Sequence, residues 1–486
     1  MTESYQASLA RIQAKRIQDG RMIVGVAAYS DSDMYKSNQA AKHLKTPGLV
    51  SLGGGLPSSE YFPFSEISLR IPAASGGPSA PDHNVSIGKN DSKLGISEYD
   101  LSLALNYGQP MGSPPLLRFI TEHTEMLFNP PYADWRSCQT VGNTSALEQT
   151  IRLLCDKDRG DSILMEEYTF SGAIETVGPQ GIKMFGVKMD AYGLLPDEMN
   201  EMLTNWDAEA RGARKPHVLY TVPTGQNPTG TTMSLERRRA VYAVCQEHDV
   251  FIIEDDPYYF LQMQNSLDED DYTDNGGAER YVQNLVPTFL SLDTDGRVLR
   301  MDSFSKVLVP GARLGWVTAS AQVIELYLRH AEVANQGPGG FPSAMLWKLL
   351  DETWGHEGYL RWLHQLSKHY QRRRDVLLMA CEEFLPRGMF TWDVPQAGMF
   401  IWIKIKLDSE MKHIDSTAIE LEERIFDHAI ANGVLCARGS WFRVASEEPM
   451  RDISFRITFA SAEEDAMRIA VQRLSAAVRE ALGNGD

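Results

Sequence analysis

Short apolar runs alternate with amphipathic helical stretches through the middle of this chain, and this alternation limits the possible fold more than any other feature. Residues 144–156 and 234–248 repeat their apolar side chains at helical spacing, as helices that connect parallel strands do. The pattern favours an α/β fold with a mainly parallel seven-stranded sheet between two helical layers. The expected strands cover residues 137–142, 162–167, 182–189, 217–222, 250–254, 297–302 and 313–319.

The pattern changes beyond about residue 345, which predicts a second domain. A long helical region is expected at 356–384, followed by a strand at 398–405, a helix at 416–431, a strand at 453–459 and a helix from 462. We therefore expect an N-terminal arm over 1–50, a large domain over 51–345 and a smaller C-terminal α/β domain over 346–486. An acidic insertion at 262–286, with the run 268–271, reads most simply as a solvated surface loop.

Charge and hydropathy exclude several classes of partner. The formal net charge of −18 argues against nucleic acids and anionic membranes, because both bind Lys- and Arg-rich faces. A pocket can still be locally positive, so a small anionic ligand stays open. No stretch approaches the roughly 20 apolar residues of a membrane span. The N-terminus lacks an apolar signal core, which favours the cytoplasm, although Arg11, Lys15, Arg16 and Arg21 leave a mitochondrial location open.

The cysteines indicate neither a disulfide framework nor a zinc site. They are odd in number, scattered, and form no C-x-x-C pair. This usage fits reduced thiols in a cytosolic protein, and we expect no metal centre. The five are Cys138, Cys155, Cys245, Cys381 and Cys436.

A lysine follows directly after the expected strand 297–302, in the tetrapeptide Ser303-Phe304-Ser305-Lys306. The end of a parallel strand points into the crevice where α/β folds bind ligands. Ser303 and Ser305, with Arg313 seven residues beyond Lys306, could bind a phosphate. An enclosed lysine has a lowered pKa, which suits Schiff-base chemistry. The tetrapeptide alone could equally be a surface loop.

Two further strand ends carry polar groups of interest. Asp255 closes the strand 250–254, and Tyr258 follows three residues later. A carboxylate there can pair with a protonated pyridine nitrogen and keep the ring an electron sink, while Tyr258 could hydrogen-bond a ring oxygen. Asn227, in Asn227-Pro228-Thr229-Gly230 after strand 217–222, could bind the same oxygen. An acidic turn and a Pro/Gly turn are the plainer alternatives.

Two sites could bind anions at opposite ends of a ligand. Gly142-Asn143-Thr144 lies at a strand-to-helix junction, where free N–H groups and the helix dipole favour a phosphate. Ordinary N-capping explains the same residues. Arg456 lies in an expected strand of alternating polarity and could clamp a substrate carboxylate or form a surface salt bridge. Each clue is modest, but their order along the chain is improbable by chance.

This order resembles the fold-type I pyridoxal-5′-phosphate (PLP) enzymes, specifically their aminotransferases. It is most similar to the branch that holds the fungal-type aromatic-amino-acid aminotransferases and the α-aminoadipate/kynurenine aminotransferases. The resemblance runs from about residue 50 to the C-terminus. The helix start Gly142-Asn143-Thr144-Ser145 departs from the Gly-Ser-Gln version of relatives. The segments that carry it are Gly53–Pro57, Leu105–Gly108 with Gly112, Tyr220–Gly230, Ile252–Phe260 and Met301–Gly315.

The resemblance implies a role for each of these residues on the cofactor. Lys306 would carry PLP as a Schiff base and later move the proton from the substrate Cα. Asp255 would pair the pyridine nitrogen, and Asn227 and Tyr258 would hold the ring oxygen. Phe170, where relatives often carry Tyr, would stack on the ring. The phosphate ligands would be Asn143, Thr144, Ser303, Ser305 and Arg313.

The remaining implied roles concern the substrate and a second subunit. Arg456 would clamp the α-carboxylate, with Asn227 beside it, and Gly55 would line the substrate pocket. Tyr107 would reach the phosphate in the neighbouring subunit, so the resemblance implies an obligate homodimer with shared active sites.

The implied reaction is a ping-pong transfer of the amino group from Phe, Tyr or Trp to 2-oxoglutarate. The insertion at 262–286 is more like that of the fungal aromatic enzymes, which favours aromatic substrates over 2-aminoadipate or kynurenine. A PLP-dependent decarboxylase or lyase is a second alternative, although a clamp by Arg456 disfavours loss of the carboxylate. A non-catalytic PLP-binding regulator is a third, but the first 45 or so residues are too short for a DNA-binding module.

Overall fold

The computed structural model describes residues 47, 55–73, 81–263, 277–406, 417–445, 450 and 452–483. Apart from Pro47, the expected N-terminal arm lies outside the described residues, and so does the acidic run 268–271. Of the Gly53–Pro57 segment, Gly55 onward is described. Within the described ranges, no helix is long and apolar enough to cross a bilayer.

A seven-stranded sheet lies at the centre of the larger part of the molecule, in the order β3-β11-β10-β9-β8-β4-β5. β11 is antiparallel to β10 and β3, and every other neighbouring pair is parallel. The expected mainly parallel α/β sheet is therefore confirmed. Its strands are β3 (Trp135–Thr140), β4 (Ser162–Glu166), β5 (Lys183–Val187), β8 (Val218–Thr221), β9 (Phe251–Asp255), β10 (Val298–Ser303) and β11 (Gly315–Ser320).

The expected strand 182–189 is shorter than predicted. β5 ends at Val187, and the next residues form a separate two-stranded sheet of β6 (Met189–Asp190) and β7 (Gly193–Leu194). Gly193 has a φ of 93°, which permits the tight reversal between them. The apolar run therefore belongs to two elements rather than one.

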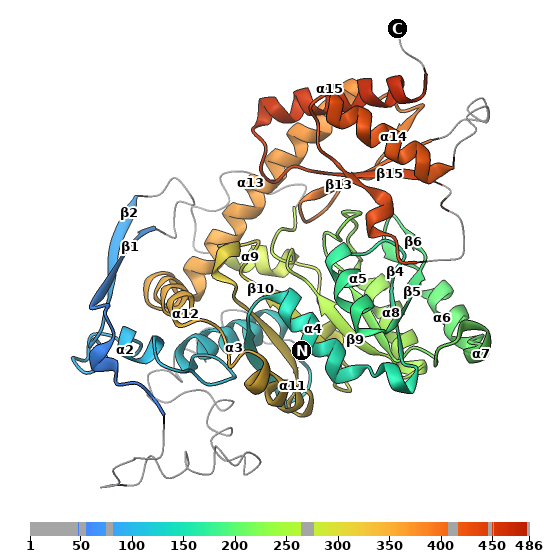
Figure 1. The fold of residues 1–486 in the computed structure, drawn as a ribbon. Helices are drawn as coiled ribbons and strands as arrows, with labels where there is room; N and C mark the ends of the chain where they lie inside the picture. Colours follow the sequence, from blue (N-terminus) through green and yellow to red (C-terminus); the bar gives the residue numbers. More distant parts are fainter. Residues whose placement is uncertain are drawn as a thin grey trace.

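Helices cover the central sheet, as Figure 1 shows. The strands β4, β8, β10 and β11 are buried at every position, because helices cover both faces of a parallel sheet. Helix α8 begins after Ser234, whose hydroxyl accepts a hydrogen bond from the N–H of Arg237. The covering helices include α3 (Pro114–Phe128), α4 (Asn143–Leu154), α5 (Ser171–Val177), α6 (Pro196–Thr204), α8 (Leu235–Glu247) and α11 (Ala321–Ala334).

A smaller antiparallel sheet forms near the C-terminus, in the order β12-β13-β15-β14. Its strands are β12 (Phe390–Thr391), β13 (Phe400–Ile405), β14 (Ala437–Arg438) and β15 (Ile453–Thr458). Helices α14 (Ala418–Ala431) and α15 (Glu464–Ala481) pack beside it (Figure 1). Thr417 and Glu420 form a capping box that begins α14. This part has an apolar core of its own.

The long helix α13 (Gly355–Phe384) joins the two cores. Tyr359 and Leu363 in its first half belong to the larger core, whereas Leu377 and Cys381 in its second half belong to the smaller one. The domain boundary expected near residue 345 stays a prediction. Shorter helices complete this region and the rest of the larger part: α2 (Leu101–Ala104), α7 (Ala208–Arg211), α9 (Gly277–Asn284), α10 (Phe289–Leu292), α12 (Gly340–Trp347) and the π-helical Lys348–Trp354.

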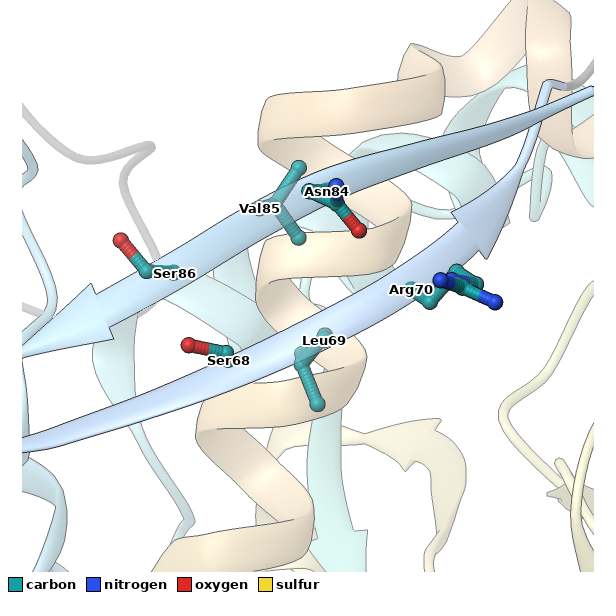
Figure 2. A pocket seen from close by; sticks show the side chains of 6 residues that line it. All are labelled: Ser68, Leu69, Arg70, Asn84, Val85 and Ser86. Atoms are coloured by element: carbon teal, nitrogen blue, oxygen red, sulfur yellow. The ribbon is translucent and has the colours of Figure 1, made fainter.

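A two-stranded antiparallel ribbon of β1 (Glu66–Pro72) and β2 (Asp82–Gly88) was not foreseen. Its apolar side chains, including Ile71 and Ile87, face the larger core. The indole of Trp354 donates a hydrogen bond to the carbonyl of Pro72, 2.9 Å away. An open groove follows the ribbon, and it contains none of the expected site residues. Figure 2 shows its lining: Ser68, Leu69, Arg70, Asn84, Val85 and Ser86.

Candidate active site

The expected site residues lie at the carboxyl ends of neighbouring parallel strands. Asp255 ends β9 and Ser303 ends β10, while Asn143 and Asn227 lie in the segments that follow β3 and β8. Because β3, β8, β9 and β10 point the same way, these ends share one edge of the sheet. This is the edge at which open α/β sheets bind ligands.

Asp255 is the buried centre of the site, with 6% of its surface exposed. The Asn143 amide donates to its Oδ1 at 2.7 Å, and the Tyr220 hydroxyl donates to its Oδ2 at 2.7 Å. Burial raises the pKa of Asp255, while these two hydrogen bonds and the charge of Arg300 oppose the rise. The carboxylate is thus oriented by two neutral donors.

The strand that carries Asp255 also carries charges on its opposite face. Side chains alternate along β9, so Glu254 and Asp256 point away from Asp255. There they meet two buried guanidinium groups: Arg300 approaches Glu254 at 3.2 Å and Asp256 at 3.0 Å, and Arg238 approaches Glu254 at 3.6 Å. Arg300 also pairs with Asp302 at 2.8 Å, so this buried ionic cluster holds three carboxyl groups and two guanidinium groups on the face of the sheet opposite Asp255.

Lys306 follows β10 and is half-buried. Burial lowers the pKa of its amine, and the positive charges of Arg456 and Arg313 lower it further. Within the described residues, Lys306 forms no hydrogen bond or ion pair of its own. The lowered pKa makes the neutral form of the amine, which is the nucleophile for a carbonyl group, available at lower pH than in a free lysine.

Ser303, Ser305 and Arg313 form a compact group beside Lys306. The Ser303 hydroxyl donates to Ser305 Oγ at 2.9 Å, and Arg313 donates to the same Oγ at 3.3 Å. Gly142, just before α4, has a φ of 90°, and a Cβ atom there would lie 2.4 Å from Arg313 Nη2. Glycine therefore lets the guanidinium approach the helix start, where free N–H groups favour a phosphate.

At the start of α4, the Asn143 side chain turns towards Asp255, whereas the Thr144 side chain is exposed. We expected both at the phosphate, but the Asn143 amide is used by Asp255 and by the carbonyl of Met301, 3.1 Å away. Its side chain turns inward because α4 begins directly at the sheet edge beside β10. Thr144 is exposed at the helix start and borders, with Arg313, an open hollow between α4 and α5.

Asn227 links the central sheet to the smaller sheet. Its Oδ1 accepts a hydrogen bond of 2.6 Å from Arg456 Nη1, and its side chain opposes the rise in pKa that burial causes at Tyr258. The Arg456 guanidinium lies 4.3 Å from the ring centroid of Phe400 and 4.6 Å from that of Phe442. Two aromatic faces thus hold the arginine, and its remaining N–H groups can bind a carboxylate.

Phe170, Tyr107 and Gly55 lie at the margins. Phe170 directly precedes α5, and its ring lies against Gly172, where a Cβ atom would come within 2.5 Å. Tyr107 is 70% exposed on this chain, and Gly55 has nothing within 4 Å of its Cβ position. In the described part of the chain, no hydrogen bond or ring contact joins these three to the other site residues, so their roles stay predictions.

Sequence reasoning missed Tyr220, Phe400 and Phe442 as parts of the site. Tyr220 is fully buried in β8, and a buried tyrosine hydroxyl needs a partner. That requirement was the available signal. Phe400 and Phe442 carried none, because their approach to Arg456 depends on the register in which β13 pairs with β15 and on the path of the chain after β14.

The arrangement fits a phosphorylated pyridine aldehyde. A hydroxyl and guanidinium group at a glycine-opened helix start suits a phosphate, and Asp255 suits a protonated ring nitrogen. Lys306, directly after Ser305, supplies an amine with a lowered pKa. Within the described residues, no cluster of His, Cys, Asp and Glu could hold a metal ion.

Comparisons with known proteins agree with this geometry. The family model "Aminotransferase class I and II" matches residues 104–474. An aromatic amino acid aminotransferase of Schizosaccharomyces pombe is 41% identical over 450 residues, covering 91% of this chain and 94% of that protein. The L-tyrosine:2-oxoglutarate aminotransferase atrD of Tapinella panuoides is 37% identical over 382 residues, covering 76% of this chain and 71% of that one. The crystal structure of the aminotransferase Aro8 from Candida albicans matches with a TM-score of 0.84 and 37% identity, covering 93% of this chain and 96% of that one.

Proposed function

Because the chain belongs to the class I and II aminotransferase family, we propose that it exchanges the amino group of Phe, Tyr or Trp with 2-oxoglutarate, with PLP as its cofactor. The observation that carries this proposal is the position of Asp255 and Lys306 at the ends of two neighbouring parallel strands, β9 and β10: a buried, doubly hydrogen-bonded carboxylate ends one, and an amine of lowered pKa follows the other. When bound, PLP supplies an aldehyde and an electron-accepting ring.

Each residue then has a physical task. Asp255 pairs the ring nitrogen and, because it is buried, acts through a low local dielectric. Lys306 holds the cofactor and afterwards carries the proton between the substrate Cα and the cofactor. Ser303, Ser305, Arg313 and the N–H groups at the start of α4 hold the phosphate.

Arg456 binds the α-carboxylate that amino acids and 2-oxo acids share. Its two aromatic neighbours and Asn227 fix the guanidinium, so the Cα–H bond of each substrate is presented to Lys306 in the same orientation. Two half-reactions can therefore use one site. Relatives named for aromatic amino acids and tyrosine support aromatic side chains, and 2-aminoadipate or kynurenine is the alternative substrate class.

A homodimer with shared sites and a cytoplasmic location complete the proposal. The Tyr107 side chain is exposed, so it is free to reach the phosphate of a second copy. Light scattering of the purified protein tests the first point, and Tyr107→Phe should weaken PLP binding in a dimer that still forms.

Replacement of Lys306 tests the central chemistry. We expect Lys306→Ala to lower the rate of amino transfer from Phe to 2-oxoglutarate by about 10⁴-fold, because the amine and proton carrier are both lost. The visible absorption of the bound cofactor should disappear as well. A variant with wild-type turnover would end the proposal.

A further inference from the structure

Glu166 is a fully buried carboxyl group at the end of β4, and none of the roles above uses it. Its Oε1 accepts a hydrogen bond of 2.6 Å from the Thr221 hydroxyl, and its oxygens lie 3.2 and 3.3 Å from the N–H of Val222. Its Oε2 accepts a hydrogen bond of 3.1 Å from the amide Nε2 of Gln226. Among the described residues, no cation lies within ion-pair distance of it. A buried carboxylate without a cation is costly to keep, which calls for a reason.

Gln226 is the next link, and its side-chain hydrogen-bonding groups are used. Besides Glu166, its Nε2 donates to the carbonyl of Tyr168 at 2.6 Å. Its Oε1 accepts from the backbone N–H of Thr229 at 2.8 Å and from the hydroxyl of that residue at 2.7 Å. Because the oxygen serves a backbone donor, the amide cannot turn round to offer Glu166 an acceptor.

Asn227 directly follows Gln226 in this loop and is the residue that receives Arg456. The smaller part of the molecule presses on the same loop: a Cβ atom on Gly225 would lie 2.6 Å from backbone atoms of Gly398. With so little space, a small displacement of the loop moves Asn227 relative to Arg456. Glu166 therefore lies at the base of the contact that holds the carboxylate clamp.

We propose that Glu166 is a positioning residue that acts through Gln226 to hold Asn227 against Arg456, and so sets the affinity of the site for substrate carboxylates. The inference rests on the proposed function of Arg456 as that clamp. Burial raises the pKa of Glu166 to about 7, and the charge of Asp255 contributes to the rise. The Thr221 hydroxyl, the Val222 N–H and the Gln226 amide all donate to Glu166 and oppose this rise, so the loop is built around two acceptor oxygens.

The test is Glu166→Gln, which keeps the shape but places an NH₂ group against Gln226 Nε2 or the Val222 N–H. We expect the Kd of the holoenzyme for an unreactive aromatic carboxylate, 3-phenylpropionate, to rise about tenfold, the size of one charge-assisted hydrogen bond. The KM for Phe should rise by a similar factor, while kcat changes by less than about threefold. The Kd is read from the absorption of the resting holoenzyme and needs no turnover.

Asp161→Asn is the matched control. Asp161 is also a buried carboxylate, but it lies just before β4, at the far end of the same strand, paired with Arg159 and Arg214. Its loss should lower the thermal unfolding temperature and leave the Kd for 3-phenylpropionate unchanged. If Glu166→Gln behaves like this control, with lowered stability and a wild-type Kd, Glu166 is only structural and the inference is wrong.

A second variant covers the case in which Glu166→Gln does not fold. Gln226→Met removes the link itself, and the inference predicts the same tenfold rise in Kd; a wild-type Kd overturns it. The parent enzyme keeps the two proposals apart. If the wild type and Asp161→Asn bind no PLP or transfer no amino group, the proposed function is wrong. If both are active but the Glu166 and Gln226 variants keep the Kd of the wild type, only this inference is wrong.

Discussion

The two ends of the site, around Asp255 and around Arg456, are built in different ways. Asp255 and its partners Asn143 and Tyr220 all come from the central sheet and the start of α4. Arg456 comes from β15 of the smaller sheet and reaches Asn227 across the contact between the two parts of the molecule. One end is complete within a single core, and the other exists only where two cores meet.

The difference shows how a single site can bind one cofactor and two substrates. Asp255 is buried, hydrogen-bonded on both oxygens and backed by the ionic cluster on the opposite face of β9, so the cofactor end is rigid before any ligand binds. Arg456 is held by aromatic faces and one hydrogen bond. Both substrates would present the same α-carboxylate to Arg456 in turn, so this end is set by the contact between the two parts of the molecule.

Removal of Asp255 should have the largest effect of the changes that separate the two ends. Asp255→Ala leaves the ring nitrogen without its partner, and we expect kcat to fall by about 10³-fold with weaker PLP binding. Affinity of the remaining holoenzyme for 3-phenylpropionate should stay near wild type, because Arg456 is untouched. Steady-state kinetics and a PLP titration measure the two effects, and near-normal kinetics would remove the role assigned to Asp255.

Arg456→Lys should produce the converse pattern. Lysine keeps the charge but loses the planar fork and the stacking between Phe400 and Phe442. We predict a rise of about 30-fold in KM for both Phe and 2-oxoglutarate, with an unchanged Kd for PLP. A rise for only one of the two substrates would mean that Arg456 does not serve both half-reactions.

Tyr220→Phe probes the rigid end more gently. The variant removes one hydrogen bond to Asp255 and fills the same space, so we expect about a tenfold loss of PLP affinity without a change in KM for Phe. Fluorescence quenching on addition of PLP to the apoenzyme gives the affinity. An effect on KM instead would show that the two ends are coupled more tightly than the contacts indicate.

The smallest expected effect is the electrostatic influence of Arg456 on the pKa of Lys306. Burial first, and then Arg456 and Arg313, lower the pKa of Lys306. Arg456→Gln removes one positive charge, so the pKa of Lys306 should rise and the neutral amine should appear at higher pH. The pH dependence of PLP uptake by the apoenzyme should therefore shift upward by less than about one unit. A downward shift would contradict the sign of this interaction.

The same two ends differ in how far the sequence could predict them. The strands and the residues at their ends, Asp255, Asn227 and Lys306, could be predicted because continuous apolar runs mark buried strands and polar residues stop them. The direction of β11 was not foreseen, although its link from β10, Phe304–Leu314, has no crossover helix, which parallel neighbours require.

Contacts that depend on packing could not be predicted. The turn of the Asn143 side chain towards Asp255, and the aromatic faces on Arg456, follow from how elements distant in sequence approach each other. The β1–β2 ribbon was missed although Ile67, Leu69 and Ile71 alternate with polar residues as strand residues do. The partner strand β2 carries only Val85 and Ile87 as apolar residues, so the pairing of the two segments was not evident.

The central claim is that Lys306, Asp255 and Arg456 together transfer an amino group through PLP. An absorbance titration tests it most directly. Purified protein with PLP is given Phe, Tyr or Trp in steps without an oxo acid, and 2-oxoglutarate is added last. The account predicts a visible band that bleaches with the aromatic amino acid and returns with 2-oxoglutarate. A protein that shows no visible band after addition of PLP, or whose band ignores every amino acid, would contradict it.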